Sequence, residues 1–144
     1  MGNFNNISED ISTESGLVSN SPQTRLIVLN GDIEDDTVQE CILAIKEMEL
    51  ANPTQPIDLY VSSDGGSADA FFALYDIMNT VKCPINTYAL GRAYSAGCLV
   101  IMSGTGVRRA FPHCRIMLHQ LSSYNFGTLS AMDVYHQEIL AVQK

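Results

Sequence analysis

A serine and a histidine in this sequence have neighbours that suit nucleophilic catalysis. Ser95 is the centre of the segment 93–97, whose small-x-Ser-x-Gly pattern is typical of a serine lifted above a sheet on a sharp turn. His119 follows the apolar run 116–118 and ends a predicted strand. Histidine can take a serine's proton near neutral pH because its pKa lies close to that value. Each pattern is common by itself, so only their combination predicts a nucleophile, Ser95, with its general base, His119.

Two adjacent glycines could supply the part of such a site that stabilises negative charge. Gly65 and Gly66 precede a predicted helix, and without side chains they leave backbone amides open to a ligand. Open amides suit an oxyanion or a peptide backbone, although a glycine pair is more often only a tight turn. Ser95 also stands at the head of a predicted helix, where free amides and the positive end of the helix dipole favour a developing oxyanion.

Strands and helices are predicted to alternate along the chain and to position these residues. Apolar runs that end in turn residues predict strands, and apolar residues at helical spacing predict helices. The predicted strands are 26–29, 57–61, 85–90 and 115–119, and the predicted helices are 37–51, 71–78, 96–102 and 128–144. This order predicts an α/β fold, with repeated β-α units and right-handed crossovers around a mostly parallel sheet. The carboxyl ends of such strands gather ligands, so the turns that carry Gly66 and Ser95 should face one crevice.

Two local boundaries follow from cap and turn residues. Thr37 and Glu40 have the spacing of a capping box, which predicts that they satisfy free amides at the start of the first helix. The segment 91–94 is interpreted as a turn between a strand and a helix. The other two histidines, His113 in a loop and His136 within the last predicted helix, have no comparable place at a strand end.

Composition predicts one globular domain with no role for a metal, a membrane or a nucleic acid. The chain has 144 residues, 46% of them hydrophobic, which can fill a core over 25–144. Residues 1–24 are polar, lack a periodic apolar face and are predicted to form a flexible arm. The four cysteines lack zinc spacing, and no apolar run approaches the roughly 20 residues that cross a bilayer. The net charge of -8 argues against a nucleic-acid partner, and the want of a signal-peptide pattern predicts a cytoplasmic protein.

Three motifs, taken together, resemble those of the Clp protease proteolytic-subunit (ClpP) family in order and spacing. They are the glycine pair 65–66, the Gly-x-x-x-Ser-x-Gly segment 91–97 and the Arg-Ile-Met-Leu-His-Gln segment 115–120. The resemblance runs from about Arg25 to the last residue and is far more specific than any one motif. It implies the ClpP/crotonase-type α/β fold and a serine endopeptidase of an ATP-dependent Clp protease, which cleaves unfolded polypeptides through an acyl-enzyme. Residues 1–24 correspond to the family's axial-loop segment.

The resemblance also implies roles for single residues. Ser95 matches the nucleophile, His119 the general base, and the backbone amides of Gly66 and Ala96 the oxyanion hole. Asp64 stands where the family usually has proline. The family's triad aspartate lies several tens of residues after the histidine, on a strand that this chain does not contain, so no residue is assigned to that role. We therefore expect the chain to be C-terminally truncated relative to the family, with an incomplete handle region and reduced activity or none.

Partners follow from the resemblance, and two other functions stay open. It implies unfolded protein or peptide substrates, a homo-oligomer of stacked heptameric rings, an AAA+ unfoldase of the ClpX or ClpA type, and neither a metal nor an organic cofactor. One alternative is a catalytically silent ClpP-like subunit that modulates an active ring, which the missing aspartate favours. The other is a crotonase-fold acyl-CoA enzyme, in which paired amides hold a thioester enolate. The intact serine and histidine, and the lack of a basic patch for the CoA phosphates, favour the peptidase.

Overall fold

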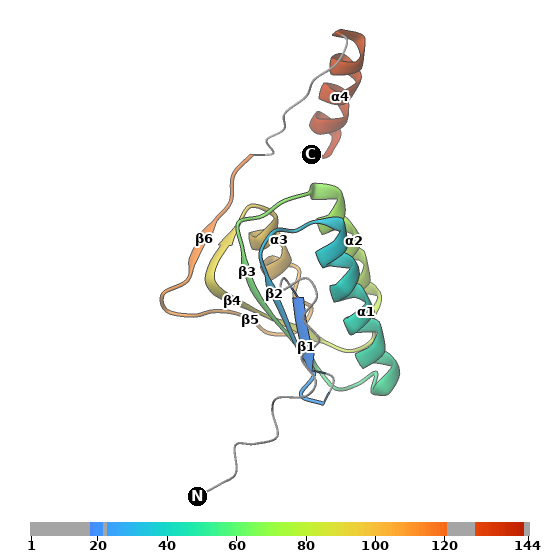
Figure 1. Ribbon diagram of the computed structural model, residues 1–144, viewed down its shortest axis with the longest axis vertical. Helices are drawn as coiled ribbons and strands as arrows, with labels where there is room; N and C mark the ends of the chain where they lie inside the picture. Colours follow the sequence, from blue (N-terminus) through green and yellow to red (C-terminus); the bar gives the residue numbers. More distant parts are fainter. Residues whose placement is uncertain (1–17, 22, 121–128, 143–144) are drawn as a thin grey trace, which may run out of the picture.

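Strands and helices alternate along most of the chain in the computed structural model, which describes residues 18–21, 23–120 and 129–142. The elements in chain order are β1 (Val18–Ser21), β2 (Leu26–Asn30), α1 (Asp35–Ala51), β3 (Ile57–Ser63), α2 (Ala68–Thr80), β4 (Ile85–Tyr94), α3 (Ala96–Met102), β5 (Arg108–Ala110), β6 (Arg115–Met117) and α4 (Leu129–Val142). Figure 1 shows this order along the chain. The predicted β-α alternation is confirmed.

One sheet contains all the strands, and it is mostly parallel. Its order is β1-β2-β3-β4-β5, and β6 also pairs with β4. Among the strands of the described residues, only β1 runs antiparallel to its neighbour, β2. β5 and β6 follow each other along the same edge of β4, since β5 pairs with 87–89 and β6 with 92–94. This arrangement confirms the predicted α/β class with its mostly parallel sheet.

Helices α1, α2 and α3 cover one face of the sheet (Figure 1). Along β3 the side chains alternate between fully buried and half-buried, because successive residues point to opposite faces. The covered face forms the core, which includes Ile27, Leu29, Leu59, Val61, Ile85 and Ala89 from the strands and Ile45, Met48, Leu74 and Met78 from the helices. Each large aliphatic side chain buried there contributes about 1.5–3 kcal/mol. The other face carries Tyr60 stacked on Tyr88, with ring centroids 4.6 Å apart.

The first helix begins earlier than its predicted capping box. Glu34 is the N-cap of α1, and Thr37, predicted as the first member of the box, is the third helical residue. The backbone N–H of Glu34 donates to the Thr37 hydroxyl oxygen at 3.0 Å. The cause lies upstream, where Ile33 forms a parallel bridge with Gly66 and fixes the chain's entry into the helix. The capping box is real, but Thr37 closes it and Glu40 has no part in it.

The segment 91–94, predicted as a turn, continues β4 to Tyr94. Gly91 adopts φ 68°, which permits the bend that the small residues suggested. The strand nevertheless continues, because Ala93 pairs with Ser63 of β3 on one side and with Ile116 of β6 on the other. β6 in turn is shorter than the predicted strand and ends two residues before His119. Pairing with neighbours overrides local turn composition here.

Part of the predicted arm joins the sheet. Residues 18–21 form β1, whose pairing with β2 supplies backbone hydrogen bonds to a segment without an apolar face. Residues 1–17 and 22 lie outside the described part of the chain. The mobility of the arm and a domain boundary at residue 25 therefore stay predictions.

The last helix, α4, matches the helix predicted from residue 128, although residues 121–128 and 143–144 lie outside the described part. It stands clear of the sheet and the other helices in Figure 1. Val134, Tyr135 and Leu140 are exposed on it. None of the helices in the described ranges combines the length and the apolar character needed to cross a membrane.

Candidate active site

Ser95 occupies a strained backbone conformation between β4 and α3. Its φ of 51° and ψ of -121° lie where residues with side chains are seldom found. Two hydrogen bonds hold this turn: the Ser95 N–H donates to the Met117 carbonyl at 2.8 Å, and the Ser95 carbonyl accepts from the Leu99 N–H at 3.2 Å. The turn is therefore tied both to β6 and to the first turn of α3. A strained serine between a strand and a helix is the geometry of a nucleophile elbow, as the pattern of 93–97 predicts.

The glycine turn after β3 touches the serine turn closely. Gly65 has φ 111°, and a Cβ placed on it would lie only 2.7 Å from the Ser95 Cβ. Gly97 approaches β3 in the same way, since a Cβ there would lie 2.9 Å from the Ser63 Cβ. Both distances are shorter than real side-chain contacts, so the two turns can meet only because both positions are glycine. Steric exclusion thus explains why the motifs have glycine at positions 65 and 97.

Gly66 is fixed on one side by Ile33. The Ile33 N–H donates to the Gly65 carbonyl, and the Ser67 N–H donates to the Ile33 carbonyl, each at 2.7 Å. A Cβ on Gly66, whose φ is 146°, would collide with the Ile33 carbonyl oxygen at 2.3 Å. Within the described ranges the Gly66 N–H donates no hydrogen bond, and neither does the Ala96 N–H. Both amides are therefore available to an acceptor, and the one on Gly66 is held in place by Ile33.

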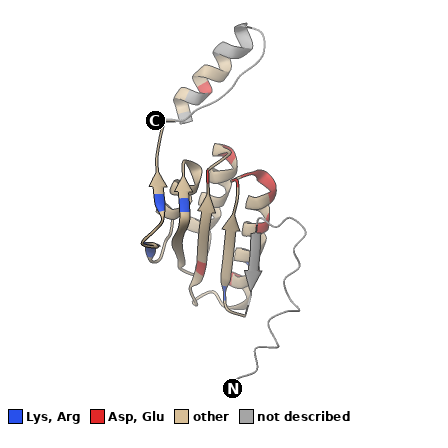
Figure 2. Ribbon diagram, turned by 60° about the vertical axis from the view of Figure 1, so that its left-hand side comes forward, with Lys and Arg blue, Asp and Glu red and all other residues tan. Residues whose placement is uncertain are grey.

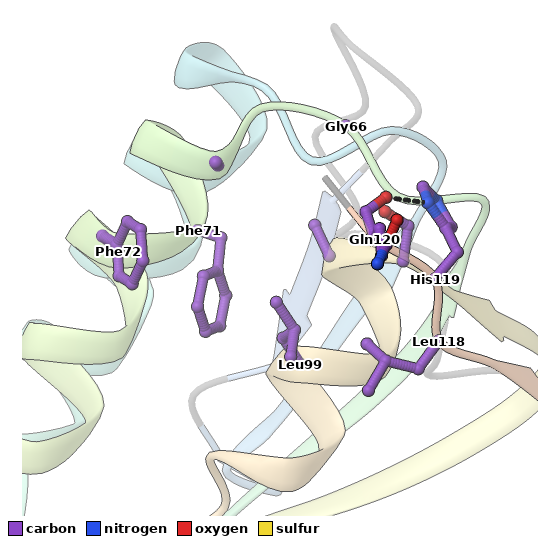
Figure 3. Close-up of a pocket in the computed structure, with 10 residues that line it drawn as sticks. Gly66, Phe71, Phe72, Leu99, Leu118, His119 and Gln120 are labelled. Carbon is purple, nitrogen blue, oxygen red and sulfur yellow. Dashed lines mark hydrogen bonds between the residues drawn. The ribbon is translucent and has the colours of Figure 1, made fainter. Parts of the chain in front are cut away.

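All four residues predicted for the site line one cavity of about 500 Å³. Ser95, Ala96, Gly66 and His119 reach it from the β3-α2 turn, the start of α3 and the segment after β6. The remaining lining residues are mostly apolar: Ala68, Phe71, Phe72, Leu99, Leu118 and Gln120 (Figure 3). The structure thus brings together the residues that the sequence singled out. Beside them lie Phe71, Phe72, Leu99 and Leu118, which we call the apolar wall.

His119 is exposed and is oriented by its own backbone neighbour. Its Nδ1 and the Gln120 backbone oxygen form a hydrogen bond, drawn as a dashed line in Figure 3. A carbonyl oxygen can only accept, so this bond assigns the proton to Nδ1. In the neutral ring that carries its proton on Nδ1, the other ring nitrogen, Nε2, is an acceptor. This is the tautomer that a general base at Ser95 requires.

The four cysteine thiols are not activated. Burial raises the pKa of Cys83, Cys98 and Cys114, and it raises that of Cys41 to about 12. The thiolate is the nucleophilic form, so these side chains react poorly near neutral pH. Among the described residues, no three His, Cys, Asp or Glu side chains gather as a metal site would require.

Sequence reasoning found the polar part of the site and missed its apolar wall. Phe71 begins the second predicted helix, and in the structure it is 6% exposed. Phe72, its neighbour, is 42% exposed and still lines the cavity. Leu99 and Leu118 join it from elements far apart in the sequence. No local pattern separates a pocket residue of this kind from an ordinary core residue.

Comparison with known proteins agrees with this architecture. The model of the Clp protease family matches residues 12–144. A protein of Bdellovibrio bacteriovorus named ATP-dependent Clp protease proteolytic subunit is 36% identical over an alignment of 124 residues, and the match covers 83% of this chain and 58% of the relative. The chain thus spans about 58% of the length of that relative. Since the family model covers nearly the whole chain, glycine and serine turns included, the chain belongs to the Clp protease family.

Proposed function

We propose that this chain acts as a serine endopeptidase, the proteolytic subunit of a Clp-type protease, with Ser95 as its nucleophile. The observation that carries the proposal is the strained Ser95 turn, which shares one cavity with His119 and with the amides of Gly66 and Ala96. Membership of the Clp protease family supports it. The reaction is hydrolysis of a peptide bond through an acyl-enzyme.

The proposed chemistry assigns one step to each group. His119 Nε2 takes the Ser95 hydroxyl proton while Oγ attacks the substrate carbonyl, and the amides of Gly66 and Ala96 donate to the oxyanion that forms. The C–N bond then breaks as His119 passes the proton to the leaving amine. Water attacks the ester with His119 again as base, which releases the acid and restores Ser95.

The apolar wall supports a preference for substrates with an apolar side chain near the scissile bond. Phe71, Phe72, Leu99 and Leu118 lie on the cavity that Ser95 also lines. Burying apolar surface contributes about 25 cal/mol per Å², so an aliphatic or aromatic side chain seated there would hold the carbonyl beside Ser95. A charged side chain would lose its hydration without gaining a partner.

Assembly and delivery belong to the same proposal. The name of the Bdellovibrio relative calls it ATP-dependent, which supports an ATPase partner such as an AAA+ unfoldase of the ClpX or ClpA type. Stacked heptameric rings would enclose the cavity and restrict it to unfolded polypeptides. A reducing, cytoplasmic location fits four cysteines that are all free thiols.

The resemblance assigns the third catalytic group to an aspartate that would hold His119 Nδ1. Among the described residues that contact is made by the Gln120 carbonyl. A carbonyl fixes the same tautomer but carries no full negative charge, so it stabilises the imidazolium less than a carboxylate would. We therefore propose that an aspartate in this role would raise the rate further.

Fluorophosphonate labelling separates the peptidase from its alternatives. Trypsin should release residues 93–108 as one peptide containing Ser95 and Ser103. We expect the label on Ser95 in the parent chain and in Ser103→Ala, and no label in Ser95→Ala. A silent ring subunit or an acyl-CoA enzyme would leave both serines unlabelled, and that result would refute the proposal.

A further inference from the structure

An exposed ion pair joins the two turns of the candidate site. The Arg92 Nε donates to the Asp64 Oδ1 at 2.7 Å. Asp64 directly precedes Gly65 and Gly66, and Arg92 lies three residues before Ser95. The ion pair therefore links the segment that carries the Gly66 amide to the segment that carries Ser95.

A bulge in β4 brings Arg92 to this position. Two steps along β3, from Val61 to Ser63, correspond to four along β4, from Ala89 to Ala93. The extra residues include Gly91, whose φ of 68° bends the strand. Bulges next to active sites commonly re-aim a side chain, and here the re-aimed side chain is that of Arg92. Arg92 pairs in register with Arg115, the first residue of β6, and blue marks the basic residues on the strands in Figure 2.

The ion pair acts where small displacements matter. Gly65 already packs against Ser95 so closely that a Cβ would lie 2.7 Å from the Ser95 Cβ. Gly66 is held by Ile33 on the side away from the serine turn. The Asp64–Arg92 ion pair is a second link, from the β3-α2 turn directly to β4, the strand that ends just before Ser95.

We propose that Asp64 and Arg92 are positioning residues, whose ion pair holds the Gly66 amide in register with Ser95. This inference rests on the proposed function. Neither residue touches the reacting atoms, and both are about half exposed, at 56% and 45% of their side-chain surface. Exposed pairs weaken as salt screens them. The reactivity of Ser95 is therefore sensitive to ionic strength.

The test compares the rate of Ser95 modification by a fluorophosphonate in four variants. Asp64→Asn and Arg92→Gln each remove the pair, and the double variant Asp64→Arg with Arg92→Asp restores it with reversed charges. Lys46→Gln is the matched control, since it removes the ion pair with Glu49 on α1, and Lys46 is as exposed as Arg92, at 46% against 45%.

At low salt we expect each single variant to react about two- to five-fold more slowly than the parent. The reversed pair should recover most of the rate, and Lys46→Gln should keep all of it. High salt should lower the parent to the level of the single variants and change those variants little. With a peptide substrate, the loss should fall on kcat and leave KM nearly unchanged, because the oxyanion contact strengthens in the transition state.

Equal rates for the parent and both single variants would overturn the inference, as would a reversed pair no faster than its single components. A parent that does not label at all would refute the proposed function instead. In that case, amide hydrogen exchange at Gly66 still tests whether the ion pair holds the glycine turn, because it does not depend on the reactivity of Ser95. Faster exchange in Arg92→Gln than in Lys46→Gln supports this role of the ion pair, and equal exchange refutes it.

Discussion

The two ends of the parallel strands are stabilised by opposite means. At the amino end, Arg25 is 5% exposed, and its guanidinium donates to four backbone carbonyls, those of Met48, Asn52, Gln55 and Pro56, at 2.6–3.1 Å. At the carboxyl end, two amides stay open and a strained serine faces a cavity. One end of the sheet is closed by a side chain, and the other is held open by the absence of side chains.

The comparison shows how a small fold separates stability from chemistry. The carbonyls at the end of α1 carry the negative end of its dipole, so a buried guanidinium there is stabilised without a carboxylate partner. The Ser95 turn differs, because its backbone is strained. The close packing of Gly65 against Ser95 and of Gly97 against β3 stabilises that strained conformation. Changes at the first end should alter folding, and changes at the second should alter reactivity.

The largest effect should come from Ser95→Ala. Removing Oγ leaves no nucleophile, so hydrolysis should fall to the background rate; loss of the serine from an intact triad commonly lowers kcat by about 10⁶-fold, and the fall is smaller where no aspartate supports the histidine. The free energy of unfolding should change by less than about 0.5 kcal/mol, because alanine keeps the backbone and the packing. Peptide hydrolysis and urea unfolding measure the two quantities. A stability loss as large as that of a core substitution would contradict the claim that the carboxyl end of the sheet determines reactivity and not folding.

Gly65→Ala should be the next most severe change for reactivity. The new Cβ would meet the Ser95 Cβ at 2.7 Å, so one of the two turns must move. A misplacement of about 1 Å can lower the rate about 100-fold. Gly91→Ala is the matched control, because Gly91 also has positive φ but its nearest neighbour to a Cβ is 3.7 Å away. Both variants should lose stability from backbone strain, and only Gly65→Ala should lose most of its fluorophosphonate labelling.

Arg25→Met should produce the opposite pattern. It removes the donors of four carbonyls beneath α1, and buried acceptors left without partners cost about 1–3 kcal/mol each before water or relaxation compensates. We expect the free energy of unfolding to fall by about 3 kcal/mol. The labelling rate of the folded protein should stay within about two-fold of the parent. A stable variant with slow labelling would show that the amino end also shapes the site.

The smallest effect near neutral pH should come from Cys41, which alters the stability of the core between the two ends only in alkaline solution. Burial raises the pKa of the Cys41 thiol from its ordinary value of 9.0 to about 12, so the unfolded chain loses this proton first. The native state then binds more protons, and stability should fall between pH 9 and 12 by about 1.4 kcal/mol per pH unit from this group. Urea unfolding of the reduced protein at several pH values measures the slope. Cys41→Ala should reduce that slope, and an unchanged slope would mean that the thiol is not desolvated.

Sequence alone predicted the elements that carry their own pattern. α1 and α2 have an apolar face, β2 and β3 are apolar runs, and their positions are confirmed. β5 was missed because three exposed residues give no periodic signal. The extension of β4 to Tyr94 was missed for a related reason, since it depends on pairing with Ser63 and with β6.

The candidate site divides in the same way. Ser95, His119 and the glycine pair 65–66 were singled out because their residue types and spacing suit the chemistry, whereas the oxyanion-hole roles of Gly66 and Ala96 came from the family resemblance. The apolar wall and the Asp64–Arg92 pair come from contacts between elements distant in the sequence, which local spacing does not encode. The glycine pair 65–66 lies in the predicted turn after β3, but the close contact that requires Gly65 becomes visible only in three dimensions.

The central claim is that Ser95 and His119 act together across one cavity, and a peptide chloromethyl ketone with an apolar terminal residue tests it most directly. Such a reagent should bond its carbonyl carbon to Ser95 Oγ and alkylate His119 Nε2 with loss of chloride. We predict that peptide mapping finds the alkyl group on His119 in the parent chain and that Ser95→Ala loses most of it. Alkylation of His119 at the same rate without the serine, or alkylation confined to His113 or a cysteine, would contradict a shared catalytic site.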